Sequence, residues 1–229
     1  KPCDVAAVRR LIAADPALAA RIPYLLSFMC AGTPSQAGTL DILKRVQIMP
    51  EQVVEFRYRG EGWPGLTRAA TAEGRVGTLD YNTAWGQILN RQLQPRCKLC
   101  ADGTGEFADV VCADAWYGKD GYPDFAERAG RSLLLARSER GTDLVNAAVA
   151  AGHIAVDDFD VSELRGIQPY QFKRKTETLA RCAAARVALR AVPRYSRLAL
   201  GRAAWQIGPL QNLRAFGGAL ARILRGRLT

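Results

Sequence analysis

Apolar and polar positions alternate along the first two-thirds of the chain with two periods, one typical of helices and one of strands. Residues 4–20 repeat apolar positions at helical spacing after Asp4, which predicts a single capped helix. The apolar run 22–30 predicts a buried strand, and a turn at 31–35 opens a helix that ends near residue 45. Residues 53–59 alternate as a strand, and a turn rich in glycine leads to a second strand near 66–72 or 75–79.

The same mixture of short elements continues to residue 151. The pattern predicts a helix at 81–93, a loop at 95–105, a strand at 108–113, a loop at 114–123, a strand at 131–137 and a helix at 141–151. Two or three of these strands are apolar enough to be central. We therefore predict an α+β (mixed α/β) fold with a small mixed central sheet flanked by helices and a basic helical C-terminal tail.

The pattern of apolar and polar positions changes at residue 168. An Ala/Arg-rich helical pattern covers 173–192, Pro193 breaks it, and helical patterns return at 198–207 and 210–228. We expect a domain at 1–167 and a tail at 168–229, which the length of 229 residues accommodates. The opening Lys1-Pro2-Cys3-Asp4 reads as the middle of a motif, so we expect an N-terminal part of the protein to precede it.

The net charge of +10 is unevenly distributed. Residues 165–229 contain 14 Lys/Arg and one acid, a charge of +13, whereas residues 1–164 contain 18 bases and 21 acids, a charge of −3. Affinity for anionic partners should therefore lie in the last third. The tail arginines are Arg181, Arg186, Arg190, Arg194, Arg222, Arg225 and Arg227.

These arginines fit three situations: a solvated helix face, a docking arm for an acidic partner, or an amphipathic helix in peripheral contact with anionic lipid. Nucleic acid is the weakest alternative because Tyr195, Trp205 and Phe216 do not form a stacking array. No signal peptide and no run of 18 apolar residues occur. We expect a cytoplasmic protein, and peripheral membrane contact through the tail stays one of the alternatives.

Cys97 and Cys100 form the sharpest local feature, a CxxC pair in a glycine-flanked loop. A zinc ribbon would have a second such pair, and a thioredoxin-like pair would open a helix after a strand. The single His153, which we take as structural, limits histidine-based zinc sites and Ser–His–Asp chemistry. An iron–sulfur cluster instead takes four thiolates, which may come from distant segments.

Further cysteines lie at the ends of predicted elements. Cys3 begins a helix and Cys30 ends a strand, so both side chains can reach a shared site. The alternative is that Cys3, Cys30 and Cys112 are small buried apolar residues. We expect this of Cys182, which lies in an alanine-rich helix, and of Cys112, which lies in the middle of a predicted strand.

Five motifs occur in the order found in one known family: KPCD at 1–4, FMCAGTPS at 28–35, FRYRGEGWPG at 56–65, RCKLCADGTGEFADVVCADAWYG at 96–118, and GRSLLLARSERGTDLVNAAVAAGHI at 130–154. Through them, residues 1–171 resemble the C-terminal, larger part of the coenzyme F420 hydrogenase/dehydrogenase beta subunit family. The chain departs from the family at Ala113, where glycine is usual, and at Cys112.

The resemblance implies an iron–sulfur flavoprotein oxidoreductase with FAD and a [4Fe–4S] cluster. It implies hydride exchange with deazaflavin coenzyme F420 or another small-molecule substrate, and electron transfer to a redox partner protein. Carried over by position, the cluster ligands are Cys3, Cys30, Cys97 and Cys100.

Flavin contacts follow from the same motifs. Arg57, Arg59 and Lys98 are candidates for binding a cofactor phosphate or for stabilising the charge of the reduced flavin. Asp114 and Trp116 match the residues that the family has at these positions. Trp63 and Trp116 are candidates for stacking on the flavin ring. Solvated arginines and core tryptophans are the competing interpretations, and no catalytic residue is assigned.

A second hypothesis comes from another functional class. In it the chain is a non-enzymatic interaction domain, with a structural metal at the cysteines and a basic docking tail. The sequence leaves both hypotheses open.

Overall fold

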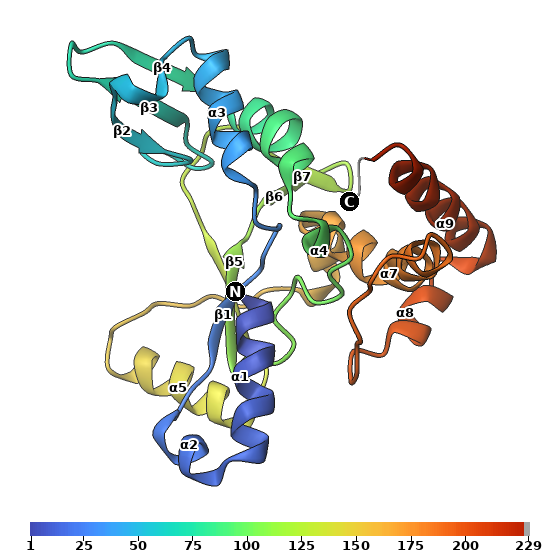
Figure 1. Cartoon of the computed structure of the whole chain (residues 1–229). Helices are drawn as coiled ribbons and strands as arrows, with labels where there is room; N and C mark the ends of the chain where they lie inside the picture. The colour runs from blue at the N-terminus through green and yellow to red at the C-terminus, as the bar shows by residue number, and fades with distance from the viewer. Residues whose placement is uncertain (227–229) are drawn as a thin grey trace. The chain divides into compact units, whose positions relative to one another are not determined.

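A three-stranded mixed sheet organises the first of two compact units in the computed structural model, which describes residues 1–226 apart from the side chain of Lys119. The first unit contains residues 1–31, 99–115 and those from 132 onward. The second unit contains residues 32–98 and 116–131. Figure 1 shows the elements of both units along the chain.

The sheet of the first unit has the order β1 (Leu26–Phe28), β5 (Val110–Asp114) and β8 (Ser132–Ala136). β1 runs parallel to β5, and β5 runs antiparallel to β8. α1 (Pro2–Ala14) packs near β1, and α5 (Glu139–Ala150) packs near β8. Val5, Leu25, Ala108 and Val111 form a buried core between α1 and the sheet. The predicted small mixed sheet flanked by helices is thus confirmed.

The basic C-terminal part is helical, as predicted. A 3₁₀ turn at Val161–Glu163 and α6 (Leu164–Ile167) lead into α7 (Pro169–Val187), which packs against α8 (Leu200–Trp205) and α9 (Gly208–Leu224), the orange and red helices of Figure 1. Leu99, Cys182, Ala185 and Ile223 form their core. Within residues 1–226, no helix has the length and apolar character needed to cross a membrane.

The boundary predicted between residues 167 and 168 stays a prediction. The long helices that follow it belong to the same compact unit as α1 and the sheet. Arg227 and the predicted helix end at residue 228 lie outside the described residues.

The second unit contains an antiparallel sheet in the order β2 (Val53–Arg57), β3 (Thr67–Thr71) and β4 (Val76–Leu79). Both strands considered after the glycine-rich turn therefore form. Ile42 of α3 (Gln36–Arg45) packs with Ala84 and Leu89. The remaining elements are a 3₁₀ turn at Pro50–Gln52, a π-helical segment at Asn82–Ile88, a 3₁₀ helix at Leu89–Gln92, α4 (Pro95–Lys98), β6 (Tyr117–Lys119) and β7 (Tyr122–Asp124).

Two predictions near the N-terminus are corrected. The helix predicted at 4–20 is split into α1 and α2 (Pro16–Arg21). Asp15 ends α1 and caps α2, because its carboxylate accepts hydrogen bonds from the N–H groups of Ala17 (2.9 Å) and Leu18 (3.1 Å). The buried strand predicted at 22–30 is only the three residues of β1, whose two outer side chains are exposed.

Later in the chain, the loop predicted at 114–123 contains the hairpin β6–β7. Asp120 (φ 51°) and Gly121 (φ 75°) both adopt left-handed backbone at its turn, which matches the twist of a tight two-residue hairpin. α4 likewise forms within the segment predicted as the loop 95–105. α7 ends at Val187, before the predicted residue 192, because Leu189 adopts φ 55°.

Candidate functional site

Cys30 lies just after β1, where the sheet of the first unit gives way to a loop. Its N–H donates to the carbonyl of Gly103 at 2.8 Å. Its carbonyl accepts from Gln171 Nε2 at 3.2 Å and Arg174 Nη1 at 3.0 Å. Cys30 is therefore held between the 99–106 segment and α7, and Arg174 brings positive charge beside it.

Cys100 lies in the same unit and is half-buried. Its Sγ donates to the Asp102 carbonyl at 3.4 Å. Burial raises the pKa of the Cys100 thiol, and the negative charges of Asp102 and Cys30 act in the same direction. The Asp102 backbone and the Arg174 guanidinium act in the opposite direction without reversing the shift. Cys100 therefore keeps its proton at neutral pH unless a metal ion replaces it.

Cys3 is exposed in the first turn of α1, and Lys1 lies beside it. Lys1 Nζ forms an ion pair with Asp4 at 2.9 Å. Asp4 raises the pKa of Lys1, and negative charge at Cys3 and Cys30 adds to the shift. Lys1 is thus within electrostatic reach of two of the predicted ligands.

Cys97 belongs to the second unit and lies in α4, three residues before Cys100 along the chain. Its Sγ accepts a hydrogen bond from the N–H of Thr33 at 3.4 Å. Gly32 permits this approach, because a Cβ there would lie 2.9 Å from Leu93 and 3.3 Å from the Cβ of Cys97, and its φ is +122°. The loop after Cys30 is therefore shaped around the Cys97 side chain.

The described residues contain no group of three or more Cys, His, Asp or Glu side chains placed to hold a metal ion. The set Cys3, Cys30, Cys97 and Cys100 remains a prediction. Cys182 is buried in the helical core, as expected. Cys112 is exposed on β5, so the expectation of a buried Cys112 is wrong.

Two of the residues predicted to contact a flavin, Arg59 and Trp116, pack together within the second unit. Trp63 stacks on Trp116 with ring centroids 4.5 Å apart. The Arg59 guanidinium lies 5.3 Å from the ring centroid of Trp116 and 5.4 Å from that of Tyr81. Arg59 Nε also donates to the Pro64 carbonyl at 2.7 Å. Arg59 and Trp116 are therefore brought together in one cation–aromatic cluster.

The other three predicted contacts are Arg57, Lys98 and Asp114. Arg57 pairs with Glu61 at 2.6 Å and with Glu55 at 3.3 Å. Lys98 is half-buried at the end of α4. Asp114 ends β5 in the first unit, opposite Ser132.

Sequence reasoning missed Gln171 and Arg174. Both bind the Cys30 carbonyl, yet they lie 141 and 144 residues from it along the chain. The positive run 173–175 was the one available signal, and its composition does not distinguish a tail from a site.

The family model for the C-terminal part of the coenzyme F420 hydrogenase/dehydrogenase beta subunit matches residues 1–162. Among solved structures, the chain is similar to one from the xenon-derivatised F420-reducing [NiFe] hydrogenase complex of Methanosarcina barkeri, at 16% identity and a TM-score of 0.49. That similarity covers 83% of this chain and 62% of the other, so this chain spans about three-fifths of its length. No curated protein matches the chain.

Proposed function

Because the chain belongs to the family of coenzyme F420 hydrogenase/dehydrogenase beta subunits, we propose that it acts as an iron–sulfur flavoprotein oxidoreductase. When bound, FAD supplies hydride exchange with deazaflavin coenzyme F420 or another organic substrate, and a [4Fe–4S] cluster supplies one-electron transfer. A redox partner protein is the expected electron donor or acceptor.

The observation that carries this proposal is the setting of Cys30 and Cys100 beside Arg174. Negative charge at Cys30 raises the pKa of Cys100, and Arg174 and Lys1 supply positive charge near these cysteines. An iron–sulfur cluster with four thiolate ligands is negatively charged, so nearby cations favour its assembly. The donor chemistry of the cysteines therefore fits the cluster.

We propose Cys3, Cys30, Cys97 and Cys100 as the four ligands. Three of them lie in the first unit, and Cys97 is linked to Cys100 by the CxxC spacing. The Thr33 N–H that binds Cys97 Sγ is the kind of donor that stabilises a metal-bound thiolate. Cys182, which is buried among apolar residues of the helical core, serves as the internal control.

For the flavin we propose contacts from Arg57, Arg59, Lys98, Asp114 and Trp116. The Arg59–Trp116 cluster supports this assignment, since it combines a flat aromatic surface with a fixed positive charge. Arginine at such a position stabilises a phosphate or a reduced, anionic ring.

Anaerobic reconstitution with iron and sulfide tests the redox proposal. We expect the wild-type chain to take up about four iron and four sulfide ions and to turn brown. C97S and C100S should each abolish the brown absorbance, because a three-thiolate site holds the cluster poorly, whereas C182S should keep it.

The competing hypothesis of an interaction domain with a structural metal predicts a different result. If the wild-type chain takes up no iron and sulfide and binds zinc stoichiometrically, the redox proposal is wrong. If C182S also loses the absorbance, the ligand set is wrong.

We further propose that the C-terminal helices make peripheral contact with an anionic membrane surface. Leu210, Leu213 and Leu224 of α9 are 61%, 67% and 76% exposed. Their spacing of 3 and 11 residues places them on one helix face, and the exposed Arg214 and Arg225 follow two of these leucines directly. An apolar stripe with arginines at its edge is typical of helices that lie in the interface of anionic bilayers.

A further inference from the structure

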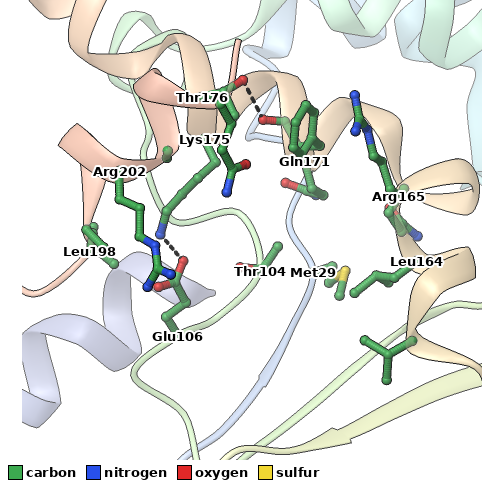
Figure 2. A pocket seen from close by; sticks show the side chains of 16 residues that line it. Met29, Thr104, Glu106, Leu164, Arg165, Gln171, Lys175, Thr176, Leu198 and Arg202 are labelled. Carbon is green, nitrogen blue, oxygen red and sulfur yellow. Dashed lines mark hydrogen bonds and ion pairs between the residues drawn. The ribbon is translucent and has the colours of Figure 1, made fainter. Parts of the chain in front are cut away.

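A cavity of about 480 Å³ lies within the first unit, among α6, α7, α8 and the segments around Met29 and Glu106 (Figure 2). This volume lies in the range of sites that hold organic molecules. Four of its sixteen lining residues fall within residues 1–162, which match the family, and twelve come after them. The cavity is therefore built mainly by the part of this chain that lies beyond the family match.

The polar lining of the cavity is positively charged. Arg165, Lys175 and Arg202 line it together with one acid, Glu106, which forms an ion pair with Lys175. Figure 2 shows Lys175, Glu106 and Arg202 on one side and Arg165 on the other. With three cations against one anion, the lining has a net charge of +2.

The two arginines are not neutralised. The Arg165 guanidinium lies 4.1 Å from the ring centroid of Phe172, which orients it without offsetting its charge. Within residues 1–226, neither the Arg165 nor the Arg202 side chain forms a hydrogen bond or ion pair. Each therefore keeps its donors available for an acidic group, and a guanidinium can bind a carboxylate, sulfonate or phosphate with two hydrogen bonds.

The rest of the lining is largely apolar. Met29, Leu164, Phe172, Leu198 and Ala203 all contribute to it. Leu198 and Ala203 are buried, so this wall is continuous with the core of the unit. A small inorganic anion would satisfy the arginines and leave this apolar surface uncovered, whereas an apolar molecule would leave the arginines unpaired. The combination selects a ligand that is acidic and apolar at once.

We propose that this cavity binds an amphipathic organic anion, with its acidic group on Arg165 or Arg202 and its apolar body against Leu164, Phe172 and Leu198. The cavity uses none of the residues that we propose as cluster ligands or flavin contacts.

Isothermal titration of the full chain with naphthalene-2-sulfonate tests the proposal. We expect one binding site per chain. R165Q and R202Q should each weaken binding about tenfold, because each removes a charge-assisted contact. R186Q removes an exposed arginine from α7 outside the cavity and should bind as the wild type does. The neutral analogue 2-naphthylmethanol should bind at least tenfold more weakly than the sulfonate.

Three outcomes would overturn the proposal: no binding of the sulfonate at millimolar concentration, equal binding by R165Q, R202Q and R186Q, or equal binding of the sulfonate and the alcohol. Circular dichroism shows whether each variant is folded. If a glutamine variant fails to fold, R165K or R202K takes its place and should keep part of the affinity, since lysine retains the charge and loses the two-pronged geometry.

Discussion

Asp109 shows how one side chain holds several segments of the first unit together. It is 1% exposed and accepts hydrogen bonds from the Leu25 N–H (2.8 Å), Ser138 Oγ (2.7 Å) and Arg9 Nη2 (3.1 Å). Burial alone raises the pKa of Asp109, but the bonds from Ser138, Leu25 and Arg9 outweigh it and hold the pKa below its usual value. The ionised carboxylate is therefore the form that stabilises the fold.

Asp109→Asn should lower the free energy of unfolding at pH 7 by about 2–3 kcal/mol, because hydrogen bonds to a buried charge are lost. A folded-state pKa below the unfolded value of about 3.9 gives stability that is present above that value and is lost as pH falls toward the folded pKa. The difference between wild type and D109N should thus narrow below about pH 4. Urea unfolding at pH 7 and pH 3 measures it.

Asp158→Asn is the matched control, since Asp158 is exposed. It should change the stability by less than about 0.5 kcal/mol at both pH values. An equal gap between wild type and D109N at pH 7 and pH 3 would show that the carboxylate charge contributes nothing.

At the scale of elements, a glycine near the start of α5 allows this helix to pack closely against the sheet. A Cβ on Gly141 would lie 2.1 Å from the carbonyl oxygen of Asp109 and 3.3 Å from Val110. The N–H of Gly141 also binds Ser138 Oγ at 3.1 Å, which caps the helix. Only glycine lets the start of α5 approach the backbone of the neighbouring strand this closely.

Gly141→Ala should destabilise the chain by about 2–3 kcal/mol, because the helix must move away from the strand. Gly217→Ala is the matched control, since Gly217 is also within a helix and a Cβ there meets no atom within 4 Å. G217A should stabilise α9 by about 0.5–1 kcal/mol through the better helix propensity of alanine. Thermal unfolding of both variants gives the comparison, and two changes of the same sign would contradict the packing argument.

Helices and strands could be predicted from the sequence where a single period of apolar residues, helical or strand-like, ran through the segment. The strands at 53–57, 110–114 and 132–136 and the helices at 36–45 and 139–150 lie close to their predicted ranges. The hairpin at 117–124 was missed because an Asp-Gly turn needs two strands around it, and each of these has only three residues. Asp15 was missed as a cap because the apolar spacing runs through it.

The site was less accessible to sequence reasoning. CxxC spacing and family motifs drew attention to Cys30, Cys97 and Cys100, because those signals are local in the chain. The bonds from Gln171 and Arg174 to Cys30 depend on the packing of α7 against the first unit, and no local pattern encodes a pairing across more than 140 residues. The stacking of Trp63 on Trp116 and the contact between Arg59 and Trp116 likewise depend on packing between segments distant in the chain, which no local pattern encodes.

At the scale of the whole molecule, charge is separated along the chain. Residues 165–229 hold a charge of +13 and residues 1–164 a charge of −3. Part of the positive charge lines the cavity, through Arg165, Lys175 and Arg202. Another part follows the exposed leucines of α9, through Arg214 and Arg225. The basic residues of the last third thus contribute both to a cavity suited to a small anion and to a helix face suited to an extended anionic surface.

Two contributions to the proposed membrane binding can be tested separately: burial of the exposed leucines of α9, and attraction between its arginines and anionic lipid. Leu213→Ser should weaken binding to vesicles of mixed phosphatidylcholine and phosphatidylserine about tenfold, since a largely exposed leucine would be buried in the interface. Arg225→Gln should weaken it about fivefold, from about 1 kcal/mol per basic residue near an anionic surface. Vesicle co-sedimentation at about 0.1 M salt measures both changes.

Leu40→Ser is the matched control, because Leu40 is a 45% exposed leucine on α3 in the second unit. It should leave vesicle binding unchanged. Pure phosphatidylcholine should bind the wild type weakly and should not distinguish Arg225→Gln from it, because no surface charge is present to attract arginine. Raising the salt to about 0.5 M should remove the advantage of the anionic vesicles, since screening shortens the reach of surface charge to a few ångströms. Equal losses for Leu213→Ser and Leu40→Ser, or equal binding to neutral and anionic vesicles, would contradict contact through α9.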